Sequence, residues 1–84
     1  MSSLFGCTLK ACRKDAGLSQ RELCKRIGVS SGYLGGIEGG KVTPSIKTIV
    51  KLERILGKKA KLLMEIKRAE RMAELLSEFA DAEK

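Results

Sequence analysis

The chain has 84 residues, with 17 Lys and Arg against 10 Asp and Glu and no histidine. This length accommodates one small domain, and the net charge of +7 favours a polyanionic partner. Without histidine, and with most carboxylates among lysines near the C-terminus, no acid–base pair stands out, which argues against an enzyme. Only three aromatic residues are present, too few for a surface that stacks single-stranded bases, so a duplex is the better candidate partner.

Three cysteines are present, Cys7, Cys12 and Cys24, and no two of them have CxxC spacing. Without histidine or a fourth thiol, we predict neither a metal site nor a cofactor. The simplest interpretation is that all three are reduced and packed as small hydrophobic residues, which predicts a cytoplasmic protein. Because the sequence contains no apolar run of the length of a signal peptide or a membrane span, we expect no membrane association.

The first predicted helix carries apolar residues at i, i+4, i+7 and i+11, and Gly17 ends it. These residues are Phe5, Leu9, Cys12 and Ala16. Three cations, Lys10, Arg13 and Lys14, lie away from that stripe, and for Arg13 solvent exposure is the alternative to an ion pair.

Two short helices joined by a tight turn follow, over residues 20–27 and 31–38. Ser19 and Glu22 have the spacing of a capping box, and Gly28 stands where a C-terminal glycine ends a helix. Ser30 repeats the N-cap signal eleven residues after Ser19, which leaves room for one short helix and a turn. This spacing indicates a helix-turn-helix unit, whose second helix can enter a DNA major groove.

A fourth helix is predicted to open at Pro44 and Ser45 and to end at Gly57. Its apolar face comprises Ile46, Ile49, Val50, Leu52 and Leu56. The predicted core of the four helices comprises Leu9, Cys12, Leu18, Leu23, Cys24, Ile27, Leu34, Ile37, Ile49 and Leu56.

The stretch from Leu9 to Gly57 resembles the phage-repressor and Cro-type (XRE-like) helix-turn-helix family. The matching positions are a small residue and a turn glycine (Cys24, Gly28), two apolar residues of the recognition helix (Leu34, Ile37), a glutamate and a glycine (Glu38, Gly40) and a Pro-Ser pair (Pro44, Ser45). The resemblance implies an all-α, lambda-repressor-like bundle of about five helices. It also implies an ion pair between Arg13 and Glu38 that orients the first helix against the recognition helix.

The last segment, residues 58–84, predicts a long amphipathic helix with an apolar stripe and exposed charges such as Glu70 and Glu74. The stripe comprises Leu62, Ile66, Ala69, Ala73, Leu76 and Ala80, widened by Met72, Leu75 and Phe79. Residues 59–66 also alternate as a strand would, but few of them are β-branched, so we prefer helix. We therefore expect a DNA-binding domain over residues 1–57 and a dimerisation helix over residues 58–84.

Candidate DNA contacts lie along the helix pair and its far end. Gln20 stands at a helix N-terminus that favours an anion, and the resemblance implies that it contacts DNA. Carried over by position, the recognition helix offers few side chains, because glycines occupy positions 32, 35 and 36. The full set of predicted DNA-binding residues is Gln20, Arg21, Ser30, Ser31, Gly32, Tyr33, Gly36, Lys41, Thr43 and Lys47.

From these observations we expect a sequence-specific transcriptional regulator that binds a palindromic duplex operator as a homodimer and represses transcription. The alternative is a protein-interaction module or an antitoxin-type regulator whose C-terminal segment binds a partner protein. Neither the operator nor the regulated gene follows from the sequence, and an activator would share the same motif.

Overall fold

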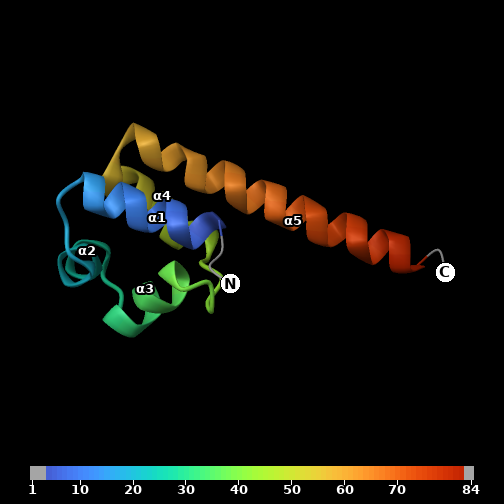
Figure 1. Ribbon diagram of the computed structural model, residues 1–84, viewed down its shortest axis with the longest axis horizontal. Helices are drawn as coiled ribbons and strands as arrows, with labels where there is room; N and C mark the ends of the chain where they lie inside the picture. Colours follow the sequence, from blue (N-terminus) through green and yellow to red (C-terminus); the bar gives the residue numbers. More distant parts are fainter. Residues whose placement is uncertain (1–3, 83–84) are drawn as a thin grey trace.

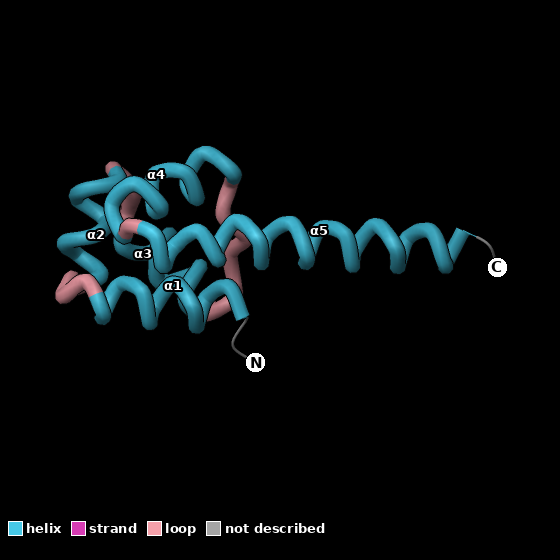
Figure 2. Tube along the Cα trace, turned by 90° about the horizontal axis from the view of Figure 1, so that it is seen from above, coloured by secondary structure: helices cyan, strands magenta, loops and turns pink. Residues whose placement is uncertain are grey.

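The computed structural model describes residues 4–82, and in that range the chain is helical. Its elements are α1 (Leu4–Asp15), α2 (Gln20–Ile27), α3 (Ser31–Glu38), α4 (Ile46–Leu56), a 3₁₀ turn η1 (Lys58–Ala60) and α5 (Lys61–Ala82). The first four helices gather into a bundle, and α5 runs along it and then projects beyond it (Figures 1 and 2). The predicted all-α fold is confirmed, and the strand alternative for residues 59–66 is wrong, since these residues form η1 and the start of α5.

Local capping explains the boundaries of α2 and α3. The Ser19 hydroxyl accepts a hydrogen bond from the Glu22 amide at 3.1 Å, and the Ser19 amide donates to the Glu22 carboxylate at 3.3 Å, which completes the capping box. Gly28 ends α2 with a φ of +71°, a conformation that favours glycine. Ser30 then caps α3 by accepting from the Tyr33 amide at 3.2 Å. The predicted bounds of both helices are therefore confirmed.

The hydrophobic core lies where α1 to α4 meet the beginning of α5. It comprises Phe5, Leu9, Leu23, Cys24, Ile27, Leu34, Ile37, Ile49, Leu52, Ala60, Leu63 and Ile66. Three residues predicted to be in the core, Cys12, Leu18 and Leu56, are only partly buried, because they lie at its margin. Ala16 is exposed because it follows the end of α1, and Ile46, at the start of α4, is 53% exposed.

The core continues past Gly57 into the segment that we predicted to serve dimerisation. Ala60, Leu63 and Ile66 are buried in the same cluster as the residues of α1 to α4. Leu62, which the predicted stripe placed beside Ile66, points elsewhere and is 49% exposed. The first turns of α5 therefore stabilise the bundle, whereas every residue from Arg68 to Glu78 is exposed. Within residues 4–82, none of the helices combines the length and apolarity needed to span a bilayer.

Helices α1 and α3 approach each other most closely at Gly6. A Cβ atom added there would stand 2.4 Å from the carbonyl oxygen of Glu38 and 2.7 Å from that of Ile37. Both oxygens belong to the backbone at the end of α3, and the backbone cannot move aside as the end of a flexible side chain could. Gly6 therefore sets the distance between the two helices, a role that the sequence did not reveal.

Replacing Gly6 with alanine should lower the free energy of unfolding, because the added methyl group overpacks the α1–α3 contact at a cost of about 1–3 kcal/mol. The matched control is Gly32→Ala, since a Cβ at Gly32 meets no atom within 4 Å. That change should stabilise α3 by up to about 1 kcal/mol through helix propensity alone. Urea denaturation followed by circular dichroism measures both effects, and equal stabilities for the two variants would contradict the tight contact at Gly6.

Candidate nucleic-acid interface

The C-terminal end of α3 is held by a buried ion pair. Arg13 donates from Nε to Glu38 Oε2 at 2.8 Å and from Nη2 to Glu38 Oε1 at 3.1 Å. The two side chains are only 9% and 4% exposed. Arg13 also donates from Nη1 to the Leu18 carbonyl at 2.8 Å, so one guanidinium joins α1, the α1–α2 turn and α3. The predicted pair is confirmed, and Arg13 is buried rather than solvated.

The N-terminus of α2 is tied to the same carboxylate. Gln20, the first residue of α2, donates from Nε2 to Glu38 Oε1 at 3.2 Å. Its Oε1 atom stands 3.9 Å from the position that a Cβ on Gly35 would occupy. The first turn of α2 therefore lies directly beside the middle of α3. The Gln20 side chain makes this internal bond and is also partly exposed at the surface.

On its other flank, α3 is linked to the N-terminus of α4 by a chain of hydroxyl groups. Ser45 caps α4 by accepting from the Thr48 amide at 3.2 Å, and its Oγ lies 3.0 Å from Thr48 Oγ1. Thr48 Oγ1 in turn lies 3.4 Å from the Tyr33 hydroxyl. Tyr33 is therefore half-buried against the core and linked to α4 through its hydroxyl group.

These links place two helix N-termini, those of α2 and α4, on either side of α3. The first amides of a helix have no intrahelical partner, and together with the helix dipole they favour an anion. Arg21 and Lys47 are exposed in the first turns of α2 and α4, which adds positive charge to both flanks. This arrangement suits a phosphate backbone running on each side of α3.

The outer surface of α3 is mostly backbone. A Cβ at Gly32 would meet nothing within 4 Å, and one at Gly35 would make only ordinary contact with Gln20. Gly36 differs, because a Cβ there would stand 2.6 Å from Val42 Cγ2. The small size of Gly36 is thus explained by packing against the following loop. Gly32 and Gly35, in contrast, leave the backbone of α3 open to close approach by a binding partner.

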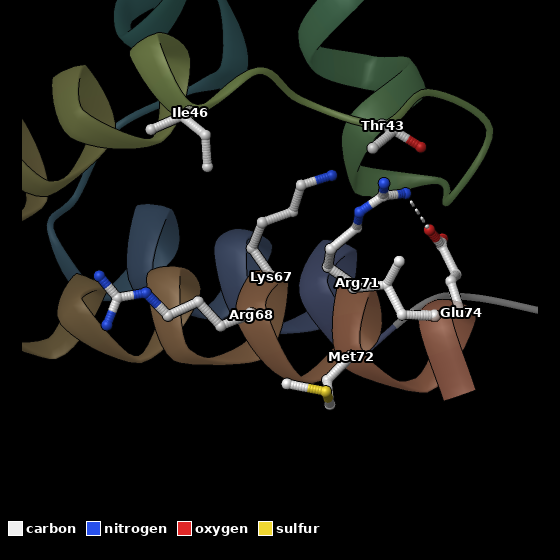
Figure 3. Close-up of a pocket in the computed structure, with 8 residues that line it drawn as sticks. Thr43, Ile46, Lys67, Arg68, Arg71, Met72 and Glu74 are labelled. Carbon is white, nitrogen blue, oxygen red and sulfur yellow. Dashed lines mark hydrogen bonds and ion pairs between the residues drawn. The ribbon is translucent and has the colours of Figure 1, made fainter. Parts of the chain in front are cut away.

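The remaining predicted contacts divide between two places. Ser30 and Ser31 stand with Gly32 at the exposed start of α3, where Ser30 is already engaged as its cap. Lys41 is exposed in the loop after α3. Thr43 instead borders a hollow against α5, with Lys67 and Arg71 extending towards it (Figure 3). Gln20 lies beside Gly35 of α3, and Arg21, Ser31 and Gly32 are exposed in the first turns of α2 and α3, whereas Thr43 borders the hollow against α5.

Val42 and Thr48 also shape this surface, although nothing in the sequence singled them out, and Ser45, which was predicted to open the fourth helix, is the N-cap of α4. Ser45 could have been recognised as an N-cap with Thr48 three residues on, but its link to Tyr33 is a tertiary contact without a local signal. All three cysteines were predicted to pack as small hydrophobic residues, but Cys7 is exposed and Cys12 is half-buried. Only Cys24 is buried, and it donates from Sγ to the Ser30 carbonyl at 3.5 Å across the α2–α3 turn.

Burial raises the pKa of the Cys24 thiol, and the Glu38 carboxylate raises it further, although Arg13 partly opposes this. The thiol therefore stays protonated and donates its weak hydrogen bond at neutral pH. Among the described residues, no group of three or more Cys, Asp or Glu side chains could hold a metal ion.

A short helix that is capped at Ser30, flanked by helix N-termini and packed against α1 and α2 in a small helical bundle is the arrangement of a helix-turn-helix DNA-binding domain. The family model for helix-turn-helix proteins matches residues 9–63. The chain accordingly belongs to the helix-turn-helix family of transcriptional regulators, which are not enzymes.

Three known proteins illustrate the similarity. The SPbeta prophage-derived HTH-type transcriptional regulator YonR of Bacillus subtilis is 41% identical over 54 residues, which cover 64% of this chain and 50% of YonR. This chain therefore spans about half the length of that relative. The restriction-modification controller protein C.AhdI from Aeromonas hydrophila has a TM-score of 0.65 at 36% identity, covering 70% of this chain and 89% of C.AhdI. A chain of the SinR protein/SinI protein complex has a TM-score of 0.66 at 27% identity, covering 95% of this chain and 94% of that one.

Removing either partner of the buried ion pair should destabilise the protein more than removing both. Glu38→Leu leaves the Arg13 guanidinium buried without its carboxylate, and such an unpaired buried charge costs about 3–5 kcal/mol. The double variant Arg13→Met/Glu38→Leu should recover much of this loss, because neither charge then remains. Thermal unfolding of Arg13→Met, Glu38→Leu and the double variant measures the coupling energy between the two side chains. Strictly additive losses of stability would show that they do not act as a pair.

Proposed function

We propose that this protein binds duplex DNA through the exposed N-terminal half of α3 and regulates transcription at the bound site. The observation that carries the proposal is the pair of helix N-termini, α2 and α4, fixed on either side of α3 by Gln20 and Tyr33. With α3 in the major groove, those N-termini would meet the two phosphate backbones that border it. The basic balance of residues 1–57, ten Lys and Arg against four acids, gives the surface the matching sign.

In this proposal the contacts divide by role. Gln20, Arg21 and Lys47 hold phosphates at the flanks, and Lys41 reaches the backbone beyond the end of α3. Ser30 and Ser31 present hydroxyl groups to base edges, and a hydroxyl discriminates between bases only loosely. Gly32 and Gly35 admit the DNA close to the α3 backbone, so water and DNA shape contribute to sequence preference. Tyr33 contributes mainly by fixing α3 to α4, and Gly36 by receiving Val42.

We propose further that the protein acts as a homodimer on a palindromic operator and represses transcription there. Two copies of α3 would enter successive major grooves about 34 Å apart. The domain to residue 57 would supply the DNA face, and the segment from residue 58 the dimer contact. The similarity to a prophage-derived regulator and to a restriction-modification controller supports regulation by a small DNA-binding protein, which would work in the cytoplasm.

The second candidate function is binding of a different protein through α5. Its exposed outer turns and the similarity to a chain of the SinR protein/SinI protein complex favour this candidate. The two functions separate experimentally, because only the first requires salt-dependent binding of duplex DNA by the purified chain alone.

Affinity for duplex DNA should fall steeply as salt rises. If each dimer neutralises about 4–8 phosphates, log K should decrease against log salt with a slope of about −4 to −7. Fluorescence anisotropy with a duplex selected from a random pool measures the slope, and Arg21→Gln should make it shallower. No duplex binding at low salt, or a slope near zero, would overturn the DNA-binding function.

Two glycine substitutions on α3 should behave differently. Gly32→Arg places a cation on the open surface and should tighten binding or change the preferred sequence, while the fold remains intact. Gly36→Arg instead collides with Val42, so it should lower the melting temperature before any effect on DNA arises. Selection of duplexes by both variants, alongside their melting curves, checks the distinction. An unchanged affinity and sequence preference for Gly32→Arg would show that DNA does not approach the start of α3.

A further inference from the structure

Residues 68–78 of α5 are not buried against the bundle. Every residue from Arg68 to Glu78 is exposed, and the helix continues to Ala82 beyond the bundle (Figure 2). A single helix of this length is marginal in water unless something packs against it. Three large apolar side chains of this stretch, Met72, Leu75 and Leu76, are 42–63% exposed. Large apolar side chains grouped on an exposed helix face are typical of an interface.

A hollow of about 730 Å³ runs along this part of α5 and ends against the start of α4. Its apolar lining comes from Ile46, Met72 and Leu75, and its cations are Lys67, Arg68 and Arg71 (Figure 3). Arg71 makes an exposed bond of 3.3 Å to Glu74 in its own helix. Within the described part of the chain, Lys67, Arg68 and Glu78 form no ion pair. The hollow therefore suits an amphipathic helix with acidic side chains.

The C-terminal half of α5 is itself an amphipathic segment that carries acidic side chains. Within α5, residues 61–72 carry four cations and two acids, whereas residues 73–82 carry three acids and no cation. A parallel pair of α5 helices would align like charges, and an antiparallel pair would align opposite charges. Antiparallel pairing with α5 of a second copy therefore covers the exposed apolar side chains and also brings opposite charges together.

We propose that the hollow receives α5 of a second copy, running antiparallel, and that this pairing is the dimer contact; the inference rests on the homodimer proposed above. With Met72 opposite Leu75 of the second copy, Glu78 of that copy falls level with Ala69, between Arg68 and Arg71. The second helix then continues along the hollow towards Ile46 at the start of α4. Two-fold symmetry repeats each of these contacts, so every substitution acts twice.

Charge reversal distinguishes the antiparallel arrangement from the others. Arg71→Glu and Glu78→Arg should each raise the dimer dissociation constant about tenfold or more, because each places like charges together. The double variant Arg71→Glu/Glu78→Arg should recover part of this loss and bind more tightly than either single variant, since the charges at positions 71 and 78 are again opposite while Arg68 then faces a second cation. Arg54→Glu, on α4 outside the hollow, is the control for the change in net charge. Analytical ultracentrifugation of the full-length chain without DNA measures all four.

A second pair of variants tests the apolar part of the contact. Ile46→Glu should weaken the dimer, whereas Leu62→Glu, at similar exposure but outside the hollow, should leave it intact. Circular dichroism verifies that both remain folded. A wild-type chain that stays monomeric throughout the micromolar range would overturn the pairing and leave the hollow to another protein. A dimer unaffected by the charge reversals would overturn the antiparallel arrangement alone. Duplex binding is measured separately, so its outcome does not decide either result.

Discussion

The buried carboxylate of Glu38 is the constraint on which the position of α3 depends. A charge removed from water is costly unless it is paired and hydrogen-bonded. Here Arg13 from α1 binds both carboxylate oxygens, and Gln20 from α2 binds one of them. Because three helices must meet to satisfy one charged group, their relative orientation is fixed. The close approach at Gly6 fixes their separation as well, since α1 lies against the backbone of the same residue.

This external support matters because α3 is a weak helix by its own sequence. Three of its eight residues are glycine, each costing up to about 1 kcal/mol of helix stability relative to alanine. Leu34 and Ile37 anchor its inner face in the core, while the ion pair and the hydroxyl chain from Tyr33 to Ser45 hold its end and its flank. The neighbours of α3 thus maintain a helix whose outer surface is nearly bare backbone. In the proposed function, that surface allows the DNA to approach closely.

Features that depend on neighbouring residues in the chain were predictable from the sequence. Ser19, Gly28 and Ser30 act through bonds within a few residues, and the bounds of α2 and α3 followed from them. Contacts across the fold were not predictable in this way. Periodicity could not show that Ile46 is exposed or that Leu63 rather than Leu62 enters the core, because the turn after α4 sets the rotation of α5. The packing of Val42 on Gly36 depends on loop geometry that no spacing rule describes. The ion pair of Arg13 was anticipated through family resemblance and not through its own helix pattern.

DNA is expected at the N-terminal half of α3, and a second basic surface of the chain provides a comparison. A hollow between α2 and α4 is lined by four cations, Lys25, Arg26, Lys51 and Arg54. Titration of the ¹⁵N-labelled protein with a selected duplex, followed by amide chemical shifts, separates the two surfaces directly. We expect the largest shifts at residues 20–21, 31–35 and 47, where helix N-termini and the open glycines lie. Shifts confined to residues 25–26 and 51–54 would contradict the proposed orientation of α3 on DNA.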